Sequence, residues 1–247
     1  MLDFGFYNMD CMEGMKQFPD KYFDLAIVDP PYGINIGDEI GGGRSGMLPF
    51  GGKQNAKFKS AEQRRLEASH SGGGLCKPPK IYKAFDDSSI PSADYFKELE
   101  RVSKHRIIFG GNYFLENLGA TECLIVWDKR RRGLNFADCE IAWTNIKQPC
   151  RIFEFKWNGM LQENMKEKEH RIHPTQKPVA LYKWLLSKYA KPTDIILDTH
   201  VGSASSLVAC RETGHKYVGF EIDPDYYAMA KKRLDAAEAQ GNIFDYL

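Results

Sequence analysis

The sequence predicts an α/β fold built around a mostly parallel sheet. Short apolar runs bounded by turn residues alternate along the chain with segments of helical period, which is typical of strand-helix-strand units. Acidic residues stand at the ends of three of these runs, at Asp29, Asp198 and Glu221. Because ligands of open α/β sheets bind at the carboxyl ends of strands, a functional site is expected there.

Eight segments are expected to form the strands. Each is short and apolar and is bounded by residues that favour turns. The segments are Phe4–Asn8, Asp24–Asp29, Arg106–Gly110, Cys123–Trp127, Glu140–Thr144, Arg151–Phe155, Asp194–Asp198 and Tyr217–Glu221.

Five segments between these runs are expected to be helices. They are Cys11–Phe18, Ala93–Ser103, Pro178–Tyr189, Ser203–Thr213 and Pro224–Ala239. Four apolar residues of the third are spaced to share one face, which should pack on the sheet: Leu181, Trp184, Leu185 and Tyr189.

The last helix should begin with Asp223 as its N-cap and Pro224 in its first turn. Three cations follow on its later turns, at Lys231, Lys232 and Arg233. A solvated helix face explains them better than a DNA site does.

The chain has 247 residues, of which 43% are hydrophobic, and this favours one domain over residues 1–247. Residues 37–83 interrupt the pattern, because they are rich in Gly, Ser, Lys and Arg and have little apolar period. A loop of this length in a compact domain is normally functional or disordered. Two interpretations stay open, a floppy insertion and a loop that covers the substrate.

Composition sets further limits. The formal net charge of +1 gives no global attraction to nucleic acid, so polyanion binding would need a local group of cations. The six cysteines are scattered without metal-ligand spacing, and no metal site is predicted. No apolar run reaches the roughly 18 residues of a membrane span, and Met1–Gly5 lacks signal-peptide features. We expect a soluble cytoplasmic protein with no membrane partner.

The most informative motif is Asp29-Pro30-Pro31-Tyr32, at the carboxyl end of the strand expected at Asp24–Asp29. Two consecutive prolines stiffen the backbone and remove two N–H donors, so this edge offers only acceptors. The alternative is a proline turn that ends a strand, with Asp29 as a cap.

An acceptor-only edge suits an exocyclic amino nitrogen, which is a poor nucleophile because its lone pair is delocalised into the ring. The Asp29 carboxylate and the Pro30 carbonyl would accept from its two hydrogens and favour a tetrahedral nitrogen whose lone pair points at a methyl donor. Tyr32 offers a flat face for the base, a contact worth roughly 1–3 kcal/mol.

The tetrapeptide resembles the signature of the DNA amino-methyltransferases, the N6-adenine and N4-cytosine family, which uses S-adenosylmethionine. A later segment, Asp198–Ser205, followed by Glu221-Ile222, is similar to that family's cofactor motif. The resemblance implies that the cofactor contacts Asp198, His200, Gly202, Ser203, Ala204, Ser205, Glu221 and Ile222.

A turn of small residues lets the backbone approach a ligand, and an acidic residue ending the next strand suits a ribose diol. The family pattern is Asp-Pro-Phe-x-Gly-Ser-Gly-Thr, whereas Thr199, His200 and Ala204 stand here for Pro, Phe and the second Gly. Ala204 is harmless in a helical conformation and costly at positive φ, so weakened cofactor binding stays open.

Two more segments are family-like. His173–Pro178 is similar to the segment that borders the methionine part of the cofactor, which implies contacts from Thr175, Gln176 and Lys177, with Asp29 also in this set. Asn8–Cys11 is similar to the motif whose acidic residue accepts from the cofactor's adenine amino group, here Asp10, with Cys11 beside it. The alternatives are a loop before a helix and a helix cap.

Four consecutive cations near a strand end are expected to contact DNA phosphates: Lys129, Arg130, Arg131 and Arg132. A solvated loop is the alternative. By resemblance, target recognition is expected in a small segment at about 145–171 or in the 37–83 insertion.

The catalytic motif comes first and the cofactor motif last, which is similar to the circularly permuted β group of the family. The resemblance implies a Rossmann-like methyltransferase fold, a mostly parallel twisted sheet with helices on both faces. It implies site-specific methylation of adenine N6 in double-stranded DNA, with the base flipped. N4-cytosine methylation and a catalytically decayed DNA-binding protein stay open, as do a restriction endonuclease partner and a monomer or homodimer. A prokaryotic or phage origin is expected.

Overall fold

The computed structural model describes residues 1–34, 82–83, 85, 87–132, 137–158 and 161–244. Within these residues, the main sheet has eight strands in the order β1-β10-β9-β2-β3-β5-β4-β6. All eight predicted strands occur in it, with ends that shift by at most three residues. They are β1 (Gly5–Asn8), β2 (Phe23–Val28), β3 (Ser103–Phe109), β4 (Cys123–Asp128), β5 (Cys139–Thr144), β6 (Arg151–Glu154), β9 (Ile195–Asp198) and β10 (Lys216–Glu221).

The sheet is mostly parallel, as predicted. The first five strands in this order, from β1 to β3, pair in parallel with one another. β5 runs antiparallel to both of its neighbours, β3 and β4, whereas β6 is parallel to β4. The pairing of β2 with β9 places the catalytic and cofactor motifs side by side, although Asp29 and Asp198 lie far apart in the sequence.

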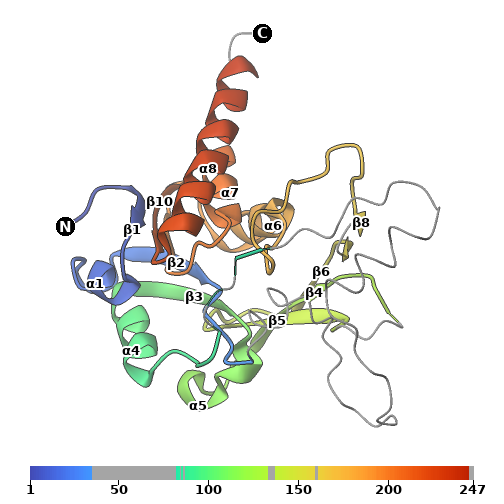
Figure 1. Ribbon diagram of the computed structural model, residues 1–247. Helices are drawn as coiled ribbons and strands as arrows, with labels where there is room; N and C mark the ends of the chain where they lie inside the picture. The colour runs from blue at the N-terminus through green and yellow to red at the C-terminus, as the bar shows by residue number, and fades with distance from the viewer. Residues whose placement is uncertain (35–81, 84, 86, 133–136, 159–160, 245–247) are drawn as a thin grey trace, which may run out of the picture.

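Helices cover both faces of the sheet (Figure 1). One face carries α1 (Cys11–Met15), α4 (Ala93–Val102) and α5 (Leu115–Leu118), and the other carries α6 (Val179–Tyr189), α7 (Ser205–Glu212) and α8 (Pro224–Phe244). Alternate residues of β2 point to opposite faces of the sheet. Ala26 packs in the hydrophobic cluster that contains α4, and Leu25 packs in the cluster that contains α6. The predicted α/β architecture and motif order are confirmed.

The buried face of α6 differs from the predicted one. Leu181 and Leu185 are buried as expected, but Tyr182 and Leu186 complete the buried face. Trp184 and Tyr189 are half-buried, and Trp184 packs on Phe153 at the rim of the sheet with ring centroids 5.2 Å apart. The reason is that α6 packs a stripe two residues wide against the sheet.

The start of α8 is as predicted, but one of its cations is not. Asp223 accepts from the backbone N–H groups of Asp225 and Tyr226, at 2.9 and 3.1 Å, and so caps the helix. Lys231 and Lys232 are exposed. Arg233 was expected on the same solvated face, and this expectation is wrong, because its guanidinium turns inward toward the cofactor motif.

Several short elements were not predicted, because they contain too few residues to show a period. They are a 3₁₀ turn η1 (Gly111–Tyr113), α5, and a two-stranded sheet of β7 (Trp157–Asn158) and β8 (Leu161–Gln162). The 37–83 insertion lies outside the described residues except for its last two positions. In the part of the chain that the structure describes, every helix is too short or too polar to cross a bilayer.

Candidate active site

The carboxyl ends of β1, β10, β9, β2 and β3 lie along one edge of the sheet, because these strands are parallel neighbours. This edge brings together residues from both ends of the chain. In order along it stand Asp10 after β1, Glu221 and Ile222 at the end of β10, Asp198 at the end of β9 and Asp29 after β2. The fold therefore brings predicted catalytic residues and predicted cofactor residues to the same edge of the sheet.

Both oxygens of the Asp29 carboxylate are engaged by the chain itself. The Tyr32 hydroxyl donates to Oδ1 at 2.5 Å, and the Lys177 ammonium donates to Oδ2. Pro30 is buried and Pro31 is half-buried between these partners. Burial raises the pKa of Tyr32 well above its usual value, so this hydroxyl keeps its proton and acts as a donor. Asp29 is held as an acceptor with a fixed orientation.

Lys177 extends this contact into a chain of ion pairs. Its Nζ lies 3.0 Å from Glu140 Oε2, and the other oxygen of Glu140 binds the Lys129 ammonium. Only 3% of the Lys177 side chain is exposed. Burial alone would lower the pKa of Lys177, but the carboxylates of Asp29 and Glu140 raise it. Lys177 thus lies at the catalytic motif.

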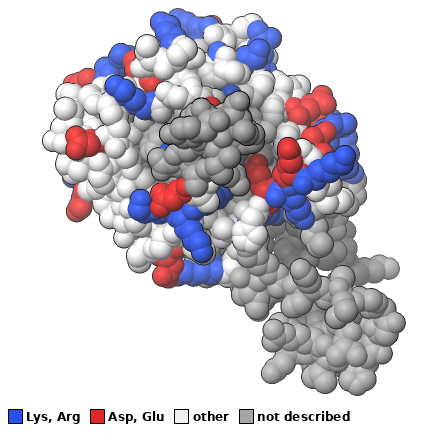
Figure 2. Space-filling model, turned by 90° about the horizontal axis from the view of Figure 1, so that it is seen from above, with Lys and Arg blue, Asp and Glu red and all other residues white. Residues whose placement is uncertain are grey.

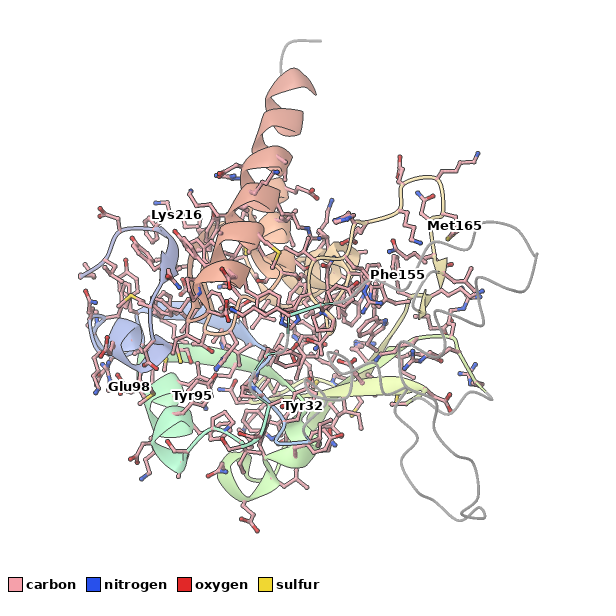
Figure 3. All side chains as sticks on the ribbon, viewed as in Figure 1. Tyr32, Tyr95, Glu98, Phe155, Met165 and Lys216 are labelled. Atoms are coloured by element: carbon pink, nitrogen blue, oxygen red, sulfur yellow. The ribbon has the colours of Figure 1, made fainter. Side chains whose placement is uncertain are left out.

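The ring of Tyr32 is not open on the face expected to receive a base. Tyr113 stacks on it with ring centroids 5.0 Å apart and an interplanar angle of 16°. Figure 3 shows Tyr32 near the middle of the molecule, between Tyr95 on α4 and the segment that carries Phe155. A second aromatic ring therefore covers this face of Tyr32, and the stacking of the two rings is favourable.

The peptide after the catalytic motif is fixed by Asp87. Its Oδ1 accepts from the N–H groups of Tyr32 and Gly33, at 2.7 and 3.1 Å, and the residue is 4% exposed. Gly33 has a φ of +72°. Sequence reasoning missed Asp87, because it stands in a polar stretch without period.

The cofactor motif is organised around two carboxylates, of which Asp198 is buried and Glu221 is half-buried. Glu221 Oε2 accepts from the N–H of Gly202 at 2.8 Å, and Asp198 accepts from the N–H of His200 and from the Ser206 hydroxyl. Burial raises the pKa of Glu221. Asp198 is 2% exposed. These contacts fold the small-residue turn around the strand ends.

The remaining predicted cofactor residues take defined places. Asp10 accepts from the N–H groups of Met12 and Glu13 and so caps α1, as the alternative reading allowed. Thr175 bonds to the imidazole of His173 at 3.0 Å, and Gln176 is buried. The side-chain hydroxyls of Ser203 and Ser205 lie 3.1 Å apart. Cys11 is half-buried beside Asp10.

His200 fills the position of the family's Phe as a neutral aromatic residue. It is enclosed against Tyr95 with ring centroids 5.4 Å apart. Burial lowers the pKa of His200 to about 4, so its ring is uncharged near neutral pH. Its Nδ1 forms a hydrogen bond with the Thr199 hydroxyl at 2.9 Å, so the two residues that replace the Pro and Phe of the family pattern contact each other.

Ala204 departs from the pattern at a backbone cost. Its φ is +60° and its ψ is +23°, the left-handed conformation that glycine adopts freely. The sequence left open whether this position is helical, and the structure shows the costly case. Ala204 is fully buried, so the packing of its methyl group offsets part of the strain.

Arg233 holds this strained turn from behind. Its Nη1 donates to the Ser203 carbonyl and to the Ser205 hydroxyl, at 2.7 and 2.9 Å, and its Nη2 pairs with Glu169 at 2.7 Å. Arg233 lies three residues after the buried Ala230, a helical spacing that could have indicated an inward position.

Replacing Arg233 by Ala should destabilise the protein and loosen the turn. The change leaves Glu169 half-buried without its guanidinium, and breaking such a pair costs about 3 kcal/mol or more. Urea denaturation measures this loss. Because the turn loses its support, calorimetric titration should show an affinity for S-adenosylmethionine that is about tenfold weaker, which corresponds to ~1.4 kcal/mol. Lys232→Ala removes an exposed neighbour and should change neither quantity; equal effects from both variants would contradict the assignment.

The environment of Glu221 fits an adenosine group. Ile222 beside it is 67% exposed, an apolar surface suited to one face of an adenine ring. Gly202 has a φ of +53°, and a Cβ there would make only an ordinary van der Waals contact with His173, at 3.9 Å, so the backbone of this turn is not crowded. The donor and acceptor set therefore fits S-adenosylmethionine.

Comparison with known proteins assigns the family. Residues 126–232 match a family model described as DNA methylase. The type II methyltransferase M.HpaI of Haemophilus parainfluenzae is 35% identical over 249 residues, which cover 92% of this chain and 73% of the relative. This chain belongs to the N6/N4 family of DNA methyltransferases.

The chain is also similar to a second curated protein and to a solved structure. The DNA adenine methyltransferase YhdJ of Escherichia coli (strain K12) is 23% identical over 262 residues, covering 92% of this chain and 81% of the relative. The crystal structure of the M1.HpyAVI-SAM complex superposes with a TM-score of 0.51 at 18% identity, covering 93% of this chain and 98% of that one. At this sequence identity, the superposition with the M1.HpyAVI-SAM complex shows that the two chains share a fold.

The four cations expected at the DNA do not form one exposed group. Lys129 is buried against Glu140, and 11% of its side chain is exposed. Arg130 pairs with Glu163, Arg132 pairs with Asp128, and Arg131 donates to the Ala137 carbonyl. Figure 2 shows Lys and Arg mixed with Asp and Glu over the face seen from above. Lys129 therefore belongs with the catalytic motif, and the three arginines remain the predicted phosphate contacts.

The buried carboxyl of Asp198 predicts a pH dependence of stability. Burial raises the pKa of Asp198 from 3.8 to about 7. The folded state thus holds this proton more tightly than the unfolded state, and the resulting stability is present below pH 4 and lost as the pH rises through 7.

We expect Asp198→Asn to remove this dependence. Between pH 4 and pH 7.5 the free energy of unfolding of the parent should fall relative to that of the variant, by no more than about 4 kcal/mol at ~1.4 kcal/mol per pKa unit. Urea denaturation at several pH values gives both curves. Curves that stay parallel over this range would show that Asp198 ionises as freely in the folded protein as in the unfolded chain.

Proposed function

We propose that this DNA methyltransferase transfers a methyl group from S-adenosylmethionine to N6 of adenine in double-stranded DNA. The observation that carries the proposal is the pairing of β2 with β9, which sets the Asp29 carboxylate beside the turn that begins at Asp198. The Asp that precedes Pro-Pro-Tyr and the similarity to YhdJ, a DNA adenine methyltransferase, favour adenine.

The residues of the chain have distinct roles in this proposal. Asp29 and the Pro30 carbonyl accept from the two amino hydrogens, which turns the nitrogen lone pair away from the ring. Tyr32 supports the base in place of Tyr113, whose side chain is 44% exposed on a short turn. The base must leave the duplex, because its amino group lies in the pairing edge.

The methyl donor is an activated sulfonium, so orientation contributes most of the rate. The amino nitrogen attacks the methyl carbon, the nitrogen–carbon bond forms as the sulfur–carbon bond breaks, and the nitrogen then loses one proton to Asp29 or to water. Glu221, Gly202 and the exposed Ile222 hold the adenosine end, and Asp10 is proposed to bind its amino group in addition to capping α1.

Contacts to DNA are proposed for Arg130, Arg131 and Arg132, with phosphates replacing the carboxylate partners of two of them. Target recognition is proposed for the segment 145–171, which contains β6, β7 and β8. These elements lie beyond β4, at the end of the sheet away from the adenosine residues.

Nucleoside analysis tests the proposal. The protein is incubated with labelled S-adenosylmethionine and unmethylated DNA, the DNA is digested, and the labelled nucleoside is identified by chromatography and mass. N6-methyldeoxyadenosine is the expected product. N4-methyldeoxycytidine would replace adenine by cytosine as the target, since both amino groups present the same chemistry. No label in any nucleoside, with DNA binding intact, would indicate a DNA-binding protein without catalysis.

A further inference from the structure

Four buried or half-buried side chains of alternating charge adjoin the catalytic motif. Three ion pairs join them, between Asp29 and Lys177, between Lys177 and Glu140, and between Glu140 and Lys129. Each member lies on a separate segment: after β2, before α6, on β5 and after β4. The fold therefore assembles the series, and no local sequence pattern produces it.

A buried ion network of this kind contributes little net stability, because removal of the charges from water offsets their attraction. It is more typical of functional sites, where charges are held to control a reacting group. Lys177 is the most enclosed member, with 3% of its side chain exposed, and its ammonium also faces the ring of Phe109 at 4.7 Å from the centroid.

We propose that Lys177 is a positioning residue that aligns the Asp29 carboxylate for the target amino group, and that Glu140 holds Lys177 in place. The proposal rests on the proposed role of Asp29. Because Lys177 also lies 3.4 Å from the Tyr32 hydroxyl, its ammonium fixes the carboxylate and the base-supporting ring together. It contacts neither of the carboxylates of the adenosine end, Asp10 and Glu221.

Glu140 determines how tightly Lys177 binds Asp29. Burial opposes ionisation of Glu140, but Lys177 and Lys129 lower its pKa to about 2, so it stays charged. Because the Lys177 ammonium pairs with both Glu140 and Asp29, it can weaken its contact with Asp29 when the amino group of the target base binds there. Without Glu140, the ammonium would pair with Asp29 alone and compete with the substrate.

Other titratable groups that face Asp29 come from the elements packed around it. They are the hydroxyls of Tyr32, Tyr95 and Tyr182 and the carboxyl of Asp198. Burial raises the pKa of each tyrosine well above its usual value, so these hydroxyls stay neutral over the range of an assay. The pKa of Asp198 is raised to about 7, and the contribution of this carboxyl to the pH profile is measured separately with the Asp198→Asn variant.

The test compares Lys177→Met, Lys177→Arg and Glu140→Gln, with Lys183→Met as a control. Lys183 is an exposed lysine of α6 whose partner is Glu212 at 2.9 Å. We measure kcat as a function of pH with saturating DNA, and the dissociation constant of S-adenosylmethionine by titration. The double variant Lys177→Met/Glu140→Gln removes one charge of each sign and keeps the test open if Lys177→Met alone folds poorly.

Lys177→Met should lower kcat by about 100-fold, the effect of a small misplacement of a reacting group. The pH profiles of kcat should shift in opposite directions, to higher pH in Lys177→Met and to lower pH in Glu140→Gln, because one variant loses a cation beside the catalytic motif and the other loses an anion. Lys177→Arg should restore part of kcat. Cofactor affinity should change by less than about threefold in each variant, about 0.7 kcal/mol, and the control should match the parent.

Three results would overturn the inference. One is an unchanged kcat and pH profile in Lys177→Met. A second is weakened cofactor binding with unchanged kcat, which would make Lys177 a cofactor ligand. The third is a double variant that matches the parent. The proposed function is tested separately, because an active Asp29→Ala variant contradicts it, whereas an inactive Asp29→Ala variant beside a normal Lys177→Met variant contradicts only the positioning role.

Discussion

Asp29→Ala should reduce methyl transfer by about 10³-fold, the effect typical of losing a positioned acceptor or base. The variant removes the carboxylate that would accept from the amino group and frees the Tyr32 hydroxyl, which donates to it at 2.5 Å. Transfer of a labelled methyl group to DNA under single-turnover conditions measures the effect, because it excludes product release.

The control for this variant is cofactor binding. Glu140 still pairs with Lys177 when Asp29 is absent, so the buried ammonium keeps one partner and the protein should fold. S-adenosylmethionine should bind with nearly parental affinity, since Glu221 and the Gly202 turn are untouched. Transfer within tenfold of the parent, in a folded variant, would show that Asp29 has no part in the chemistry.

Gly110→Ala should both destabilise the protein and impair transfer. Gly110 has a φ of +68°, and a Cβ built there would lie 2.3 Å from the Tyr32 ring. The ring cannot move freely, because Tyr113 stacks on it and its hydroxyl is bound to Asp29. Backbone strain of about 1–2 kcal/mol and overpacking of about 1–3 kcal/mol predict a loss of roughly 2–5 kcal/mol.

Gly214→Ala is the matched control for this change. Gly214 has a φ of +76°, but nothing lies within 4 Å of a Cβ at that position, so only backbone strain applies. Its loss should be about 1–2 kcal/mol with normal transfer. Equal losses in stability and rate for the two variants would mean that Tyr32 is not held against Gly110 as the structure shows.

The sheet was predictable from the sequence, because its strands are short apolar runs with turn residues at both ends. The parallel order could be inferred as well, since Asp29 and Asp198 both follow such runs and belong at one edge. The antiparallel insertion of β5 between β3 and β4 was not predicted. Apolar period shows that a strand exists, but it carries no signal for its direction.

The site was predictable only where its residues are close in sequence. The tetrapeptide from Asp29 to Tyr32 and the cap at Asp223 follow local rules of backbone chemistry. The sequence predicts a cofactor contact for Lys177 and a DNA contact for Lys129, but it does not show that both lysines pair with Glu140. Long-range ion pairs depend on the packing of distant segments, and no spacing rule predicts them.

Photo-crosslinking tests the central claim most directly, by asking which residue the target base touches. Once methylated sites are mapped, 5-iodouracil replaces the target base in a duplex that carries the site, and the crosslinked peptide is identified after irradiation. We expect the crosslink at Tyr32, with the base in the place that Tyr113 fills in this structure. A crosslink confined to a residue remote from the β2 and β3 ends would contradict the account.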